Sequence, residues 1–234
     1  VDDLLIKMIN QVKIVDIRAY VIDQAGSGGD YHDQEAGHWI LDSKISTPMS
    51  TYLDFKNSRT SFGINVMKSI VVEVEASDGS IGVSTGQGGA PACYMIEQHF
   101  RRFIVGLDPR DINKAWDQMY RASMYYGGKG LPMWAISVVD LALWDLLGVI
   151  RNEPVYKMIG GSVRDEIELY CTGIRPDAAK EAGFIGGKMP LPFAPVDRHE
   201  GLKANVEHFQ EMRNKVGSDF WLMADCWMSL DVSY

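Results

Sequence analysis

The order of strand and helix patterns in the last third of the chain is the feature that most constrains its fold. Three strand-like stretches alternate with two helical ones, in the order 165–173, 176–183, 184–190, 202–216 and 220–225. This β-α-β-α-β order predicts parallel strands joined by right-handed crossovers. The last stretch, FWLMAD, is a continuous apolar run, typical of a strand buried on both faces of a parallel sheet. Three such strands cannot close a barrel, so the region predicts either a small open sheet or the front part of a longer structure.

The patterns before residue 160 predict an antiparallel sheet followed by helices. Residues 12–22 alternate as a strand, and the stretch 64–76 reads as a second strand that an Asp78-Gly79 turn joins to a third. Helical patterns follow. We therefore expect an α+β domain over residues 1–160 and the start of a parallel βα domain over residues 161–234.

Helix boundary signals are present in both expected domains. Asp108 followed by proline is typical of an N-cap, and Gly148 is typical of the end of the apolar helix that starts near residue 132. The helix expected at 202–216 carries an apolar stripe made of Leu202, Val206, Phe209, Met212 and Val216.

Composition excludes several classes of protein. The chain has 234 residues, 46% of them hydrophobic and 23% charged, as in a soluble globular protein. A net charge of −8 argues against a nucleic-acid binder, because phosphate binding needs a basic field. The apolar helix is interrupted by Asp140 and Asp145, so we expect it to be buried in the protein rather than in a membrane.

The cysteine content and the N-terminal residues indicate a cytoplasmic location. Cys93, Cys171 and Cys226 are few, odd in number and without metal-ligand spacing, which favours a reducing compartment. The opening residues VDDLLIKMIN lack the basic segment and the apolar core of a signal peptide.

Two polar residues fall where α/β folds place their reactive groups, at the carboxyl ends of parallel strands. Lys188 ends the second expected strand and Asp225 ends the third. A carboxylate at this position suits Mg²⁺, which takes oxygen ligands. Spacing alone leaves the ordinary alternatives open, namely that Asp225 is a solvated strand terminator and Lys188 a surface amine. Asp231 is a candidate N-cap.

The long stretch 23–62 is rich in Gly, Ser, His and Asp, and loops of such length are either functional or disordered. His32 could donate a hydrogen bond to an anion, and Arg59 could hold a carboxylate in a bidentate fork. The alternative for Arg59 is a pair with a surface acid. His32 and His38 lack the spacing of a zinc site.

Several motifs together resemble the enolase superfamily, in its mandelate racemase-like group. The segment AISVVDLALWDLLGVIRNEPVYKMIGGSVRDEIELYCTG, residues 135–173, is similar to the segment that joins the capping domain of that superfamily to its modified TIM barrel. The stretches GGDYHDQ, TPMS, SRTSFGINV, FIGGKMP and FWLMADCWMS resemble the L-rhamnonate dehydratases within this group. The resemblance implies an α+β N-terminal capping domain followed by the first part of a modified (β/α) TIM barrel.

The resemblance also implies a site and a reaction. It makes Asp225 the first of three carboxylate ligands to Mg²⁺, and it places His32 and Arg59 among the residues that bind an acid sugar. Lys188 matches the second lysine of a K-x-K motif whose first position is Gly186 here, so Lys188 is expected to assist with substrate charge. The implied reaction removes the proton α to the carboxylate of L-rhamnonate and eliminates the C3 hydroxyl to give 2-keto-3-deoxy-L-rhamnonate.

The remaining metal ligands and a His-Asp acid–base pair are expected beyond Tyr234, in a longer protein that forms a homo-oligomer like other family members. The alternatives are another aldonate dehydratase or an epimerase of the same superfamily. If the chain is complete at 234 residues, a non-catalytic binding module is the remaining alternative.

Overall fold

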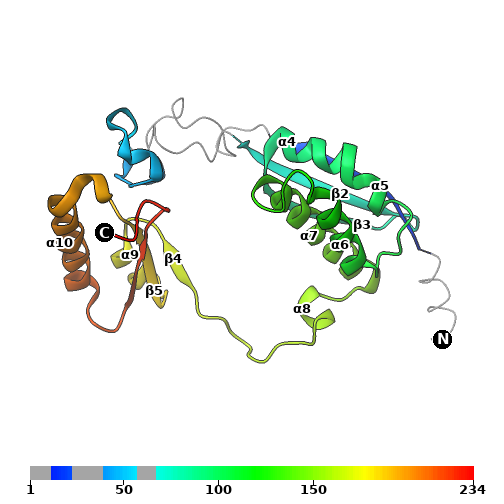
Figure 1. Ribbon diagram of the computed structural model, residues 1–234. Coiled ribbons are helices and arrows are strands. Elements are labelled where there is room, and N and C mark those ends of the chain that lie inside the picture. The colour runs from blue at the N-terminus through cyan, green and yellow to red at the C-terminus, as the bar shows by residue number, and fades with distance from the viewer. Residues whose placement is uncertain (1–11, 23–38, 57–66) are drawn as a thin grey trace. The chain divides into compact units, whose positions relative to one another are not determined.

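The computed structural model describes residues 12–22, 39–56 and 67–234, which form two compact units (Figure 1). The first unit contains residues 12–22 and 67–163, and the second contains residues 39–56 and 164–234. His32 and Arg59 lie outside the described residues.

The first unit is built on a three-stranded antiparallel sheet in the order β1-β2-β3. The strands are β1 (Ile14–Val21), β2 (Ser69–Ala76) and β3 (Ile81–Gln87). Alternate residues of β2, beginning with Ile70, are fully buried, as the sequence alternation predicts. The predicted turn is confirmed, with Gly79 at a φ of 86° that a glycine adopts without strain.

Helices cover one face of this sheet and enclose the main hydrophobic core. They are α4 (Gly89–Tyr94), the π-helical segment η5 (Met95–Phe100), α5 (Arg101–Ile104), α6 (Ile112–Ser123), α7 (Leu131–Arg151) and α8 (Val155–Met158). Helix α7 is long and apolar enough to span a membrane by length and composition. Its side chains pack on β2 and β3 in the core, so the prediction of a buried core helix is confirmed.

Two predicted helix boundaries in this unit are wrong. Asp108 does not cap a helix, because its carboxylate accepts hydrogen bonds from the backbone and guanidinium of Arg110 in a turn, and α6 begins at Ile112. Gly148 does not end α7, which continues to Arg151 and is closed by a left-handed Asn152.

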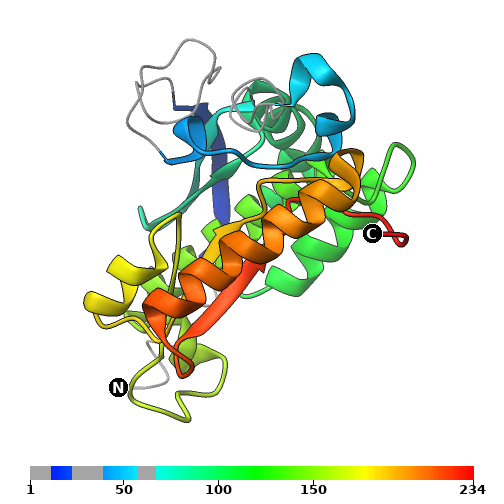
Figure 2. The same cartoon turned by 90° about the vertical axis from the view of Figure 1, so that its left-hand side faces the viewer.

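The second unit contains the predicted parallel βα order. Strands β4 (Tyr170–Thr172), β5 (Gly186–Pro190) and β6 (Trp221–Asp225) form a parallel sheet in that order. Helices α9 (Pro176–Glu181) and α10 (Arg198–Val216) lie on one face of it, toward the viewer in Figure 2. A small core of Ala179, Met189, Met212, Val216 and Phe220 joins them to the sheet. An α+β domain followed by a partial parallel βα structure is thus confirmed as the fold class.

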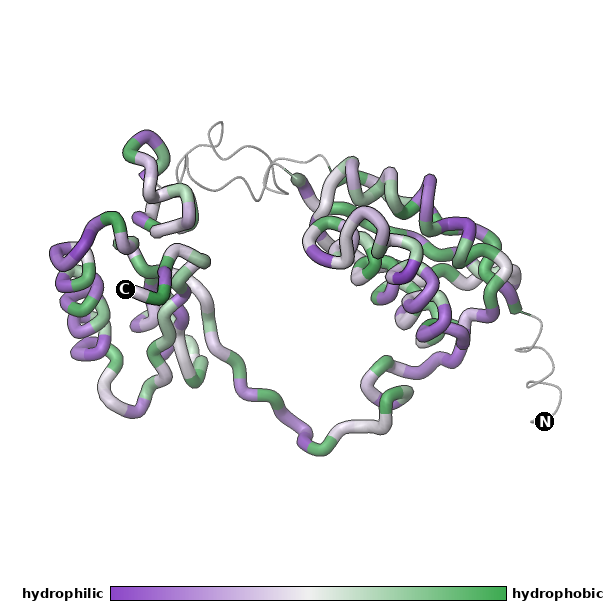
Figure 3. Tube along the Cα trace, viewed as in Figure 1, coloured by the Kyte–Doolittle hydropathy of each residue, from purple (hydrophilic) through white to green (hydrophobic). Residues whose placement is uncertain are grey.

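Two burial predictions in this unit are wrong. Strand β6 is at the edge of the described sheet, with one neighbouring strand, so Trp221 is 61% exposed rather than buried. Hydrophilic and hydrophobic residues mix along α10 (Figure 3), and Leu202 and Val206 of the predicted stripe are exposed. Gly201 and Asn205 occupy the buried face there, because the Asn205 side chain is hydrogen-bonded to the backbone of Phe193.

Residues 39–56 belong to the second unit although they precede β2 in sequence. They form α2 (Trp39–Asp42) and the 3₁₀ turns η2 (Pro48–Thr51) and η3 (Leu53–Phe55). A third 3₁₀ turn, η6 (Pro195–Asp197), leads into α10 and contacts η2. Ile45, Ser46 and Thr47 are at most 2% exposed, so this segment is packed firmly against the unit.

Candidate functional site

Lys188 and Asp225 meet near the carboxyl end of the parallel sheet. Asp225 ends β6 as predicted, but the prediction that Lys188 ends its strand is wrong, because Lys188 is the central residue of β5 and the strand continues to Pro190. The Lys188 Nζ atom lies 3.1 Å from Asp225 Oδ2, and each side chain is about one quarter exposed. Parallel pairing places Asp225 opposite Pro190, two residues beyond Lys188, so the lysine reaches along the strand toward the carboxylate. The two groups form a half-buried ion pair.

The Asp225 carboxylate is oriented by a backbone amide two residues later in the chain. Its Oδ1 atom accepts a hydrogen bond of 3.1 Å from the Trp227 amide. The backbone carbonyl oxygen of Asp225 accepts a hydrogen bond of 3.0 Å from the amide of Leu191, the residue that follows β5. Each carboxylate oxygen thus has one donor and retains a lone pair, so Asp225 could bind a cation while keeping its orientation.

The space beside Gly186 is too small for a side chain. A Cβ atom there would lie 2.8 Å from the carbonyl oxygen of Trp221 and 2.9 Å from its Cβ. A lysine at this position would therefore require the β5–β6 pair to shift. Lys188 is the lysine of this strand, and its Nζ lies 5.7 Å from the ring centroid of Tyr170 on β4.

The carboxylate at the end of the sheet is suited to bind Mg²⁺ as one of several ligands. Asp225 offers the hard oxygen that Mg²⁺ prefers. Among residues 12–22, 39–56 and 67–234, no group of three or more His, Cys, Asp or Glu side chains is placed to hold a metal ion. The described part of the chain therefore contributes a single carboxylate ligand, and Mg²⁺ needs further oxygen ligands or waters.

The segment 39–56 is tied to the loops that follow β5 and β6. The Ser46 amide and hydroxyl both lie 2.9 Å from the carbonyl oxygen of Leu191. The Ser46 hydroxyl is also 2.8 Å from that of Ser229, four residues after Asp225. One serine therefore connects this segment to two strand-end loops at once.

An ion pair adds a second anchor to the same segment. Lys56 Nζ lies 2.5 Å from Asp197 Oδ1, and the Asp197 side chain is only 11% exposed. Burial alone would raise the pKa of Asp197, but the hydrogen bonds from Lys56 and from the Ala194 amide lower this pKa below its ordinary value. Nearby, Lys44 Nζ lies 3.6 Å from the centroid of the Phe193 ring, and burial lowers the pKa of Lys44.

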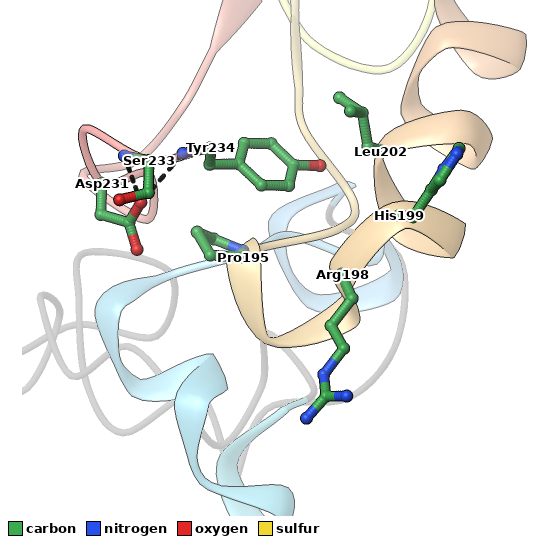
Figure 4. A pocket seen from close by; sticks show the side chains of 7 residues that line it. All are labelled: Pro195, Arg198, His199, Leu202, Asp231, Ser233 and Tyr234. Atoms are coloured by element: carbon green, nitrogen blue, oxygen red, sulfur yellow. Dashed lines mark hydrogen bonds between the residues drawn. The ribbon is translucent and has the colours of Figure 1, made fainter.

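A hollow of about 410 Å³ opens at the start of α10 (Figure 4). Its lining is formed by Pro195, Arg198, His199, Leu202, Asp231, Ser233 and Tyr234. Asp231 accepts hydrogen bonds from the amides of Ser233 and Tyr234, as an N-cap does, although no helix follows among the described residues. This hollow carries no group of the predicted site.

Sequence reasoning missed the contribution of Ser46, Ser229, Lys56 and Asp197. The hydroxyl pair joins residues 183 positions apart, which no local periodicity can indicate. The only sequence signal lay in the stretches TPMS, which begins next to Ser46, and DCWMS, which ends at Ser229.

Comparison with known proteins identifies the family to which the chain is similar. Residues 46–160 match the N-terminal domain of the mandelate racemase / muconate lactonizing enzyme family. The rhamnonate dehydratase from Gibberella zeae complexed with Mg is 58% identical, with a TM-score of 0.89, and the match covers 94% of this chain and 54% of that one. A second structure, L-rhamnonate dehydratase from Gibberella zeae, is 55% identical, with a TM-score of 0.86 and coverages of 94% and 53%.

A more distant match is a racemase from Streptomyces coelicolor A3(2) with bound magnesium. It is 32% identical, with a TM-score of 0.60, over 71% of this chain and 52% of that one. The chain thus spans about half the length of the structures that it matches. The match of residues 46–160 to the family model and the identities of 55–58% to the two dehydratase structures show that the chain belongs to the mandelate racemase-like group of the enolase superfamily.

Proposed function

We propose that the protein is a Mg²⁺-dependent acid-sugar dehydratase that acts on L-rhamnonate and forms 2-keto-3-deoxy-L-rhamnonate. The observation that carries this proposal is the placement of Asp225 beside Lys188 at the carboxyl end of the parallel sheet. The identity of 55–58% to rhamnonate dehydratases supports the choice of substrate.

Asp225 would be a ligand to Mg²⁺, with its orientation held by the Trp227 amide. Bound Mg²⁺ supplies Lewis-acid stabilisation for the negative charge that develops on the substrate carboxylate. Lys188 would bind an anionic oxygen of the substrate, because its ammonium group is released from Asp225 when that carboxylate binds the metal. His32 and Arg59 are proposed to bind the acid sugar. The proton transfers are not assigned to residues of this chain.

The test is incubation of the full-length protein with L-rhamnonate and Mg²⁺, followed by detection of a 2-keto-3-deoxy acid. We expect product with Mg²⁺ and none after chelation. Turnover of a different aldonate without turnover of L-rhamnonate would contradict the substrate. Exchange of the α proton with solvent deuterium, without keto-acid formation, would indicate an epimerase instead.

We also propose a cytoplasmic location and a homo-oligomeric assembly. Cys93, Cys171 and Cys226 are all free thiols, as expected in a reducing compartment. Sedimentation of the full-length protein tests the assembly, and a monomer at micromolar concentration would contradict it.

A further inference from the structure

The turn that follows Asp225 is a strained element of the site. The Ser229 amide is hydrogen-bonded to the carbonyl oxygen of Cys226 at 2.8 Å, which closes a four-residue turn. Its two central residues, Trp227 and Met228, have φ values of 42° and 57°. Neither is glycine, and each residue in this left-handed region costs about 1 kcal/mol or more, so such a turn persists only where its surroundings hold it.

This strained turn also orients the Asp225 carboxylate. Trp227 supplies the amide that is hydrogen-bonded to Asp225 Oδ1, and the direction of that amide depends on the left-handed conformation of the turn. If the turn relaxed to an ordinary conformation, the amide would point elsewhere and the carboxylate would lose its fixed orientation. The position of Asp225 therefore depends on whatever keeps the turn closed.

The Ser46–Ser229 hydroxyl pair is placed to do this. Ser229 Oγ lies 2.7 Å from the Cys226 carbonyl oxygen and 2.8 Å from Ser46 Oγ, and Ser46 is 2% exposed. The two hydroxyl groups make three short contacts but have only two protons to donate. Ser46 Oγ contacts the Leu191 carbonyl oxygen, Ser229 Oγ contacts the Cys226 carbonyl oxygen, and the two hydroxyls contact each other. Both carbonyl oxygens also accept a backbone amide, so either hydroxyl can turn its proton toward the other without leaving a carbonyl unpaired.

We propose that Ser46 is a positioning residue for Asp225: the Ser46–Ser229 pair acts as a latch that holds the turn Cys226–Ser229 against segment 39–56. Segment 39–56 is itself fixed by its buried residues and by the pair between Lys56 and Asp197. The latch thus makes the order of the metal-ligand loop depend on a segment in which Ser46 lies 183 residues before Ser229. The part of this inference that concerns metal binding rests on the proposed function.

The first test is hydrogen exchange of the metal-free, full-length protein. Ser46→Ala and Ser229→Ala should each raise exchange of residues 226–230 by about five-fold, the effect of one hydrogen bond. The control is Ser50→Ala, which removes a buried hydroxyl that accepts from the Thr47 amide within the same segment. This variant should raise exchange near residue 47 and leave residues 226–230 unchanged.

The second test measures Mg²⁺ affinity by calorimetry. Ser46→Ala should weaken binding by about ten-fold, as loss of a residue that orients a ligand does. The double variant Ser46→Ala/Ser229→Ala should be weakened by less than the product of the two single effects, because both single variants remove the contact between the two hydroxyls. The Ser50→Ala protein should bind Mg²⁺ like the wild type.

The outcomes separate the latch from the metal assignment. Unchanged exchange at residues 226–230 in Ser46→Ala, or multiplicative effects in the double variant, would overturn the latch even if Asp225→Asn abolishes Mg²⁺ binding. Increased exchange in Ser46→Ala and Ser229→Ala would support the latch even if Asp225→Asn binds Mg²⁺ normally, and that last result would remove the metal assignment alone.

Discussion

Replacing Lys188 by methionine tests how the ion pair at the sheet end relates to metal binding. In the structure the Lys188 ammonium lies 3.1 Å from Asp225 Oδ2, the carboxylate that we assign to Mg²⁺. A cation at this position competes with the metal for the same oxygen. Methionine keeps the length of the side chain and removes its charge, so Lys188→Met should strengthen Mg²⁺ binding while it weakens substrate binding.

The size of the effect follows from the distance and the exposure. Two unit charges 3.1 Å apart attract by about 1.3 kcal/mol in water, and exposed pairs contribute about 0.2–1 kcal/mol when measured. With about a quarter of each side chain exposed, we expect about 0.5–1 kcal/mol, which is a two- to five-fold lower Kd for Mg²⁺.

Isothermal titration of the full-length protein with Mg²⁺ measures this change, and steady-state kinetics with L-rhamnonate should show a higher KM. The control is Lys203→Met, which removes the same charge from an exposed pair with Glu207 on α10. Weaker or equal Mg²⁺ binding by Lys188→Met, relative to Lys203→Met, would refute the idea that the lysine and the metal share Asp225.

Two further predictions concern stability. Asp197→Asn should lower the free energy of unfolding by about 1 kcal/mol at pH 7, because it breaks the partly exposed pair with Lys56. Since the folded pKa of Asp197 is depressed, its contribution is present above the unfolded pKa of about 3.9 and is lost as the pH falls below it. Urea unfolding should therefore show wild type and variant converging below pH 4, and a constant difference down to pH 2 would contradict this cause. Gly82→Ala should destabilise the first unit by about 1–3 kcal/mol, because its Cβ would overlap backbone atoms of Ala142 and Leu146 in α7. Gly128→Ala, whose Cβ would be 3.5 Å from its nearest neighbour, is the control, and equal melting temperatures for the two variants would contradict the close packing.

Local patterns were sufficient to predict the first strand and the core helix, but the strand predicted at 165–173 is limited to Tyr170–Thr172. The alternation at 12–22 became β1, and the apolar helix that ends beyond Gly148 became the core helix of the first unit. A predicted helix boundary was wrong where the capping residue had another hydrogen-bond partner nearby. Asp108 pairs with Arg110 instead of capping a helix.

The candidate site was predictable only where it depends on strand ends. Lys188 and Asp225 come together because parallel pairing places β5 beside β6, so that Lys188, two residues before the end of β5, reaches Asp225 at the end of β6. The contact of Ser46 with Ser229 depends instead on the tertiary path of residues 39–56, for which the sequence contains no periodic signal. Burial along β6 was overestimated because an apolar run does not say how many neighbouring strands it has.

The most direct test of the central claim is Mg²⁺ binding by the Asp225→Asn variant of the full-length protein. The amide keeps an oxygen for the Trp227 hydrogen bond but loses the negative charge, so the fold should persist while the metal loses a ligand. The account predicts Mg²⁺ affinity at least ten-fold weaker than wild type, with the melting temperature of the metal-free protein lowered by no more than a few degrees through loss of the ion pair with Lys188. Wild-type Mg²⁺ affinity in this variant would contradict the assignment of Asp225 as a metal ligand.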